Sequence, residues 1–258
     1  MAEQHTLVAA AVEDYLLSDE VPETEMMVGA GADAAAADAG DFDRLTALAR
    51  GTSGREAWEM TKWFDTNYHY VVPMLGAVER FAPLAWRRPT GDPDVAWPIL
   101  GPFSLAKLAK LEGGTNREAL AASLGSALAD GLRTAIPKHP DIRLQLDEPC
   151  LGMALDEDDQ AIIQAAYEKL AGIGLRTPPI VTVQFGHASP ATITRLGRLG
   201  FAVQLQLADV QMLRGSEAWE SQPQHIVSVM DGRSVWGDHF EPVREILQPL
   251  VNAGEPVT

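Results

Sequence analysis

The densest group of side chains that could do chemistry lies in residues 59–73. This stretch mixes aromatic residues with polar ones, namely Lys62, Asp65, Asn67 and His69. Each of these polar side chains would need a bonding partner if it were buried in a simple core strand. We therefore expect the stretch to line a cleft.

A second set of polar side chains falls where other predicted strands end. It comprises Asp147, Glu148, Gln184, His187, Asp209, Asp231 and Arg233. In a barrel of parallel strands, ligands bind at the carboxyl ends of the strands, so the repetition indicates a site. For any one of these residues, a turn or a helix cap is an equally good interpretation.

Asp147 and Glu148 are adjacent carboxylates that could act as a general acid and base, because neighbouring carboxylates in a cleft separate their pKa values. Neighbouring residues on a strand point to opposite faces, however. Only one of the two would reach a common substrate, and we expect the other to have a structural role.

No metal site is indicated by the sequence. No two of the six histidines stand four residues apart on a predicted helix, and Cys150 is the only cysteine. One cysteine excludes an internal disulfide framework and any zinc cage built from cysteines. A reducing cytoplasm is the compartment that fits best.

Predicted strands and helices alternate along the chain, which indicates a parallel sheet with helices outside. The closed and open forms of this architecture are a barrel and a doubly wound sheet, and we favour the (β/α)8 barrel. The expected helix starts are Ser104, Thr115 with Glu118, Asp156, and Ser189 with Pro190. The expected strands lie in residues 59–73, described above, and in residues 97–102, 142–146, 180–185, 202–207 and 226–230.

Six strands leave the barrel incomplete at both ends, with one strand missing before Glu59 and one after Val257. Residues 1–41 are expected to be a separate region, formed by an N-terminal helix and a flexible loop rich in alanine, aspartate and glycine. The barrel is expected to occupy residues 42–258. The helix that starts at Ser104 is expected to carry Leu105, Leu108 and Leu111 on one face.

The net charge of −16 argues against general binding to nucleic acid or to an anionic membrane surface. An anionic ligand would need a local group of basic side chains. The first residues carry acidic side chains and no long apolar run, so we expect neither a signal peptide nor a membrane anchor.

The run from Glu59 to Tyr70, Glu-Met-Thr-Lys-Trp-Phe-Asp-Thr-Asn-Tyr-His-Tyr followed by Val-Val-Pro, resembles the signature of one family. The family is the N-terminal domain of cobalamin-independent methionine synthase. Three further motifs resemble this family in the same order: Gly-Pro within residues 99–102, Asp-Glu-Pro within 146–149 and Asp-Gly-Arg within 229–236.

The resemblance implies an enzyme of methionine biosynthesis, built of two face-to-face barrels. It moves a methyl group from 5-methyltetrahydropteroyl-polyglutamate to homocysteine. Zinc in the C-terminal barrel activates the thiol, and this sequence has no counterpart of that barrel. In the N-terminal barrel, Lys62 matches a lysine that contacts the folate's glutamate tail, and Asp65, Asn67, His69, Asp147, Glu148, Asp231 and Arg233 are candidate lining residues.

Two positions depart from the family pattern: residues 1–17 lack the family's N-terminal strand, and Met74 replaces a glutamate. We expect a folate-tail-binding part of a methionine synthase that is not catalytic alone and holds no cofactor. A fragment, a non-catalytic module that docks on a separate zinc-bearing barrel, and a diverged stand-alone barrel with its own ligand are the alternatives.

Overall fold

The computed structural model describes residues 59–63, 69–72, 74–75, 97–111, 114–137, 140–183, 186–228 and 248. The expected N-terminal helix and loop of residues 1–41 lie outside this part. So do Gln184, and the site candidates Asp65, Asn67, Asp231 and Arg233.

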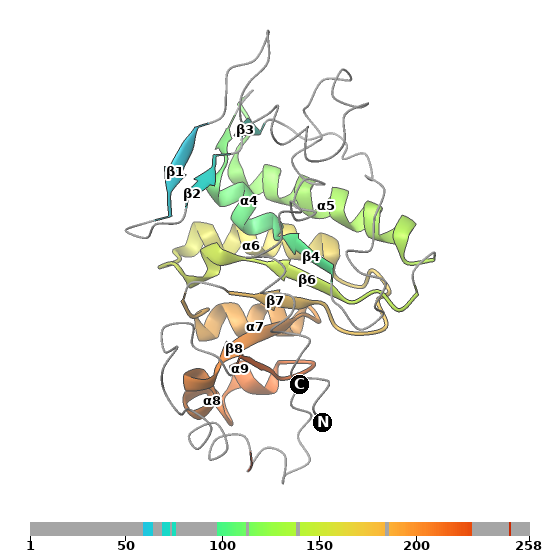
Figure 1. Ribbon diagram of the computed structural model, residues 1–258, viewed down its shortest axis with the longest axis vertical. Coiled ribbons are helices and arrows are strands. Elements are labelled where there is room, and N and C mark those ends of the chain that lie inside the picture. Colours follow the sequence, from blue (N-terminus) through green and yellow to red (C-terminus); the bar gives the residue numbers. More distant parts are fainter. Residues whose placement is uncertain are drawn as a thin grey trace.

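A sheet of five parallel strands runs through the middle of the described structure (Figure 1). Its strands are β4 (Trp97–Leu100), β6 (Leu144–Asp147), β7 (Ile180–Thr182), β8 (Ala202–Gln206) and β9 (Ile226–Ser228). Their spatial order follows their order in the sequence, and every neighbouring pair is parallel. The α/β class and the parallel sheet are thus confirmed, while the closed eight-stranded barrel stays a prediction.

The strands pair through apolar residues, as expected of a parallel sheet buried on both faces. In the register, Leu146 lies opposite Ile99 on one side and Val181 on the other. Leu146 and Val181 have no exposed surface. Apolar side chains therefore fill much of the middle of the sheet, although Gln145 is buried inside β6.

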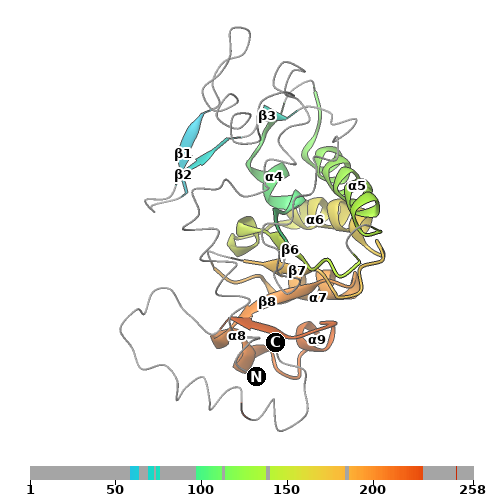
Figure 2. The same cartoon turned by 45° about the vertical axis from the view of Figure 1, so that its right-hand side comes forward.

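The longer helices that connect these strands lie along one face of the sheet (Figure 2). The long ones are α5 (Arg117–Ala135) and α6 (Glu157–Leu170), which pack against each other, and α7 (Pro190–Arg198) follows β7. The short ones are α4 (Pro102–Leu108), the 3-10 turn η3 (Pro149–Gly152), α8 (Leu207–Leu213) and α9 (Glu217–Glu220). None of the helices in the described ranges is both long and apolar enough to span a bilayer.

Asp156 and Ser189 cap α6 and α7 as expected, each accepting a hydrogen bond from the backbone N–H three residues on. Two other expected helix starts are wrong. α4 begins at Pro102 rather than after Ser104, and Leu111 belongs to strand β5 (Lys110–Leu111). α5 is capped by Asn116, whose side chain accepts from the N–H of Ala119, so the expected box at Thr115 does not form.

The described parts of residues 59–73 form a small hairpin apart from the central sheet (Figure 1). Strand β1 (Met60–Lys62) pairs antiparallel with β2 (His69–Val71), and Lys62 lies opposite His69. Close by in the sequence, β3 (Met74–Leu75) pairs parallel with β5. The expectation of parallel strands alone did not anticipate this hairpin.

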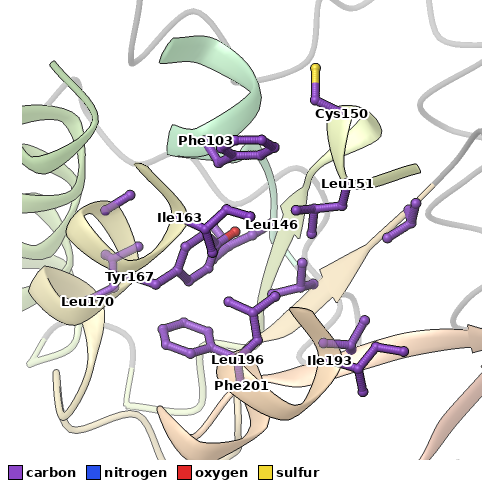
Figure 3. Close-up of a cluster of buried hydrophobic side chains, with 14 of the residues drawn as sticks. Phe103, Leu146, Cys150, Leu151, Ile163, Tyr167, Leu170, Ile193, Leu196 and Phe201 are labelled. Atoms are coloured by element: carbon purple, nitrogen blue, oxygen red, sulfur yellow. The ribbon is translucent and has the colours of Figure 1, made fainter. Parts of the chain in front are cut away.

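One hydrophobic core joins the sheet to the helices (Figure 3). Tyr167 of α6 and Phe201, just before β8, meet edge to face with ring centroids 4.9 Å apart. Phe103 of α4 and Leu151 of η3 belong to the same cluster, and none of these four side chains is more than 1% exposed. The core therefore fixes the loops that follow β4 and β6.

Candidate functional site

Glu148, directly after β6, is a fully buried polar residue at the carboxyl end of the sheet. Its carboxylate accepts hydrogen bonds from two backbone groups at the start of α4, the N–H of Phe103 at 3.0 Å and the N–H of Ser104 at 2.6 Å. The hydroxyl of Tyr167 donates a third, at 2.8 Å. Glu148 thus caps a helix that begins more than forty residues earlier, and ties β6 to α4 and α6.

Gly101 allows this approach. A Cβ atom at residue 101 would overlap the carboxyl group of Glu148, so only glycine fits between β4 and the carboxylate. The Gly-Pro pair at the end of β4 therefore has a structural reason. The glycine leaves room for the carboxylate. Pro102 can begin the helix because the first residue of a helix needs no backbone N–H for the helical hydrogen bonds.

Burial raises the pKa of Glu148 to about 7, because removal from water disfavours the charged carboxylate. The hydrogen bonds from Ser104, Tyr167 and Phe103 act in the opposite direction. The side chain has no exposed surface. A change in the protonation of Glu148 therefore affects its contacts with α4 and α6, because the carboxyl group does not reach solvent where a ligand could meet it.

Asp147, the last residue of β6, is also buried, with 2% of its surface exposed. Its carboxylate accepts a hydrogen bond from the amide of Gln145 at 2.9 Å and another from the hydroxyl of Thr182 on β7. Gln145 and Thr182 were not among the residues singled out in the sequence. Little in the sequence indicates that Gln145 and Thr182 bond to Asp147, because a polar residue inside a short strand can have many roles.

His187 and Asp209 form a hydrogen-bonded pair between the loop after β7 and the start of α8. The Nδ1 atom of His187 lies 2.8 Å and 3.0 Å from the two carboxylate oxygens of Asp209. The backbone N–H of Gln206 donates to the same carboxylate at 3.0 Å. The side chain of Asp209 is 9% exposed and that of His187 is 57% exposed, so the imidazole faces solvent while its partner is held in the protein.

Gly186, directly before His187, approaches the backbone of η3 closely. Gly186 has a φ of +132°, in the range that favours glycine, and a Cβ there would lie 3.0 Å from the carbonyl oxygen of Gly152 in η3. The loops after β6 and β7 therefore touch. His187 and Asp209 stood out in the sequence as separate strand-end residues, and the adjacency of β7 and β8 brings them together.

Lys62 lies at the end of β1 and its side chain is exposed. The N–H of Val72 donates to the carbonyl of Glu59 at 2.7 Å and extends the hairpin by one rung, and Glu59 pairs with Lys110 of β5 at 2.6 Å. Trp63, the next residue, is 7% exposed and belongs to the core. His69 is the cross-strand neighbour of Lys62, whereas Asp147 and Glu148 lie in the central sheet.

Comparison with known families identifies the domain. A family model described as the cobalamin-independent synthase, N-terminal domain, matches residues 2–255. The chain belongs to this family. The resemblance seen in the motifs is thereby confirmed, and the match extends over the first 41 residues as well.

Relatives of this synthase domain carry one name, "5-methyltetrahydropteroyltriglutamate--homocysteine methyltransferase". The protein from Rhodococcus jostii (strain RHA1) is 30% identical over 273 residues, which cover 96% of this chain and 34% of that protein. The protein from Corynebacterium efficiens is 33% identical over 204 residues, which cover 76% of this chain and 26% of that protein. The chain thus spans about a third of the length of these relatives.

A solved structure shares the fold of the synthase domain. It is titled as a B12-independent methionine synthase from Shewanella sp. W3-18-1 in complex with selenomethionine. The TM-score is 0.53 at 15% sequence identity, and the match covers 100% of this chain and 80% of the other. At this identity the likeness shows the architecture alone.

Zinc does not fit the residues of the synthase domain that the structure describes. Burial raises the pKa of the Cys150 thiol to about 12, and the side chain has no exposed surface. A cysteine that binds zinc must be a thiolate. Across the described ranges, no three His, Cys, Asp or Glu side chains gather in a way that could hold a metal ion.

Proposed function

We propose that this chain binds the glutamate tail of 5-methyltetrahydropteroyl-polyglutamate, with Lys62 as the residue that contacts a tail carboxylate. The observation that carries the proposal is the placement of Lys62: an exposed ammonium group on a hairpin whose next residue, Trp63, is anchored in the core. The names of the relatives, which contain a pteroyltriglutamate, support the choice of ligand.

The negative net charge of the chain makes the position of each local cation important for binding an anion. A protein with a net charge of −16 repels a polycarboxylate at long range, so binding depends on local cations. A lysine presents a compact positive charge that can follow a flexible anionic tail. The buried Trp63 holds the backbone beside Lys62 in place, so less conformational entropy is lost when a ligand binds.

We further propose that the chain does not transfer the methyl group alone, and that it acts in the cytoplasm within a protein that carries the remaining machinery. Transfer to homocysteine requires a thiolate nucleophile and a means of activating it. The buried Cys150 is not placed to take part in such a step. The length of the relatives, about three times that of this chain, supports a further catalytic part.

Calorimetric titration with 5-methyltetrahydropteroyltriglutamate tests the role of Lys62. Lys62→Gln is expected to weaken binding by about two- to five-fold, the effect of one exposed charge pair. The matched control is Lys169→Gln, which removes an exposed lysine from α6. Equal affinity of wild type and Lys62→Gln would remove Lys62 from the site, and no binding by wild type would end the proposal.

A further inference from the structure

His187 and Asp209 form a polar pair that the contact at Lys62 does not use. We propose that His187, oriented by Asp209, binds a second carboxylate of the glutamate tail at the carboxyl end of the sheet. This inference rests on the proposed function, because it assigns a further binding residue for the same ligand.

The geometry orients the imidazole for such a contact. An ionised carboxylate only accepts hydrogen bonds, so the bond between Nδ1 and Asp209 places a proton on Nδ1. Asp209 is itself held by the N–H of Gln206 and is 9% exposed. With Nδ1 engaged, Nε2 is the nitrogen left to meet a ligand, on a side chain that is 57% exposed.

The chemistry selects an anionic partner. An imidazole that donates from both ring nitrogens is an imidazolium, and its Nε2–H can donate a charge-assisted hydrogen bond to a carboxylate. The positive charge is then shared between Asp209 and the ligand. A proton enters the ring when the tail binds if the free ring is neutral, and no bond of the ligand breaks.

The location agrees with a ligand site. His187 and Asp209 follow β7 and β8, at the edge where open and closed parallel sheets bind their ligands. The loop of His187 is held against η3 through the contact of Gly186 with Gly152. Gly186 therefore lies close to η3, directly before the residue that presents the imidazole.

The test uses tri-γ-glutamate as the probe, the full chain, and two readouts. His187→Gln is expected to weaken binding by about three- to ten-fold, the range for one net hydrogen bond to a ligand. Asp209→Asn, which keeps an oxygen for the N–H of Gln206, is expected to weaken it less. Arg133→Gln is the control, because Arg133 is an exposed cation on α5 that pairs with Asp130.

The second readout is the side-chain ¹⁵N chemical shift of His187 in the wild-type chain, which should move when tri-γ-glutamate is added. A purely structural role for His187 would leave this shift unchanged. If wild type binds the probe, Lys62→Gln weakens it and His187→Gln does not, the inference is overturned and the proposed function stands. If wild type binds no probe at millimolar concentration, both fail.

Discussion

Replacing Glu148 with glutamine is expected to remove a pH dependence from the stability of the fold. The folded-state pKa of Glu148 is about 7, against an ordinary value of 4.5. The folded chain therefore holds this proton where the unfolded chain has released it, and the stabilising contribution is complete below pH 4.5 and lost as the pH rises through 7.

The magnitude follows from the size of the shift. Each unit of pKa difference corresponds to about 1.4 kcal/mol, so wild type should lose about 3 kcal/mol relative to Glu148→Gln as the pH rises from roughly 4 to 8. The glutamine side chain cannot titrate. Its amide group also faces the N–H of Ser104, so the variant should be less stable at low pH by about 1 to 3 kcal/mol.

Urea unfolding followed by circular dichroism at several pH values measures both effects. The relevant quantity is the free energy of unfolding of wild type minus that of Glu148→Gln, which should fall by about 3 kcal/mol, to zero or below, as the pH rises from roughly 4 to 8. Glu118→Gln, which changes an exposed carboxylate in the first turn of α5, is the control and should leave the pH dependence unchanged. Parallel curves for wild type and Glu148→Gln would refute the reasoning.

Two further predictions concern the same part of the structure. Gly101→Ala should lower the free energy of unfolding by about 2 to 4 kcal/mol, because the new methyl group overlaps the Glu148 carboxyl group; equal melting temperatures of the variant and wild type would contradict it. Cys150 should not react with a thiol-specific reagent in the native chain and should react once the chain is unfolded, because the thiol is buried and its pKa is raised to about 12; rapid labelling of the native chain would show that it is accessible.

Local signals in the sequence predicted two of the four expected helix starts correctly. Asp156 and Ser189 with Pro190 each form a cap from residues three positions apart, so their geometry is decided within one turn. The start of α4 was wrong for the opposite reason. Its N–H groups are capped by Glu148, which is distant in the sequence, and no local pattern shows that the carboxylate returns to this helix.

In the candidate site, too, local features could be predicted from the sequence and long-range contacts could not. The positions of Asp147, Glu148, His187 and Asp209 at strand ends could be predicted from alternation of strands and helices. Their partners could not, because each depends on which strands are neighbours. Asp147 bonds to Thr182 across β6 and β7, and His187 meets Asp209 across β7 and β8. The hairpin that carries Lys62 also lay outside the expected parallel pattern.

The most direct test of the central claim compares 5-methyltetrahydrofolate carrying one glutamate with the same folate carrying three, each titrated calorimetrically into the wild-type chain. If Lys62 and its surroundings bind the tail, the triglutamate form should bind at least about five-fold more tightly, and added salt should reduce the advantage. Equal affinity for the two forms would contradict a tail-binding function.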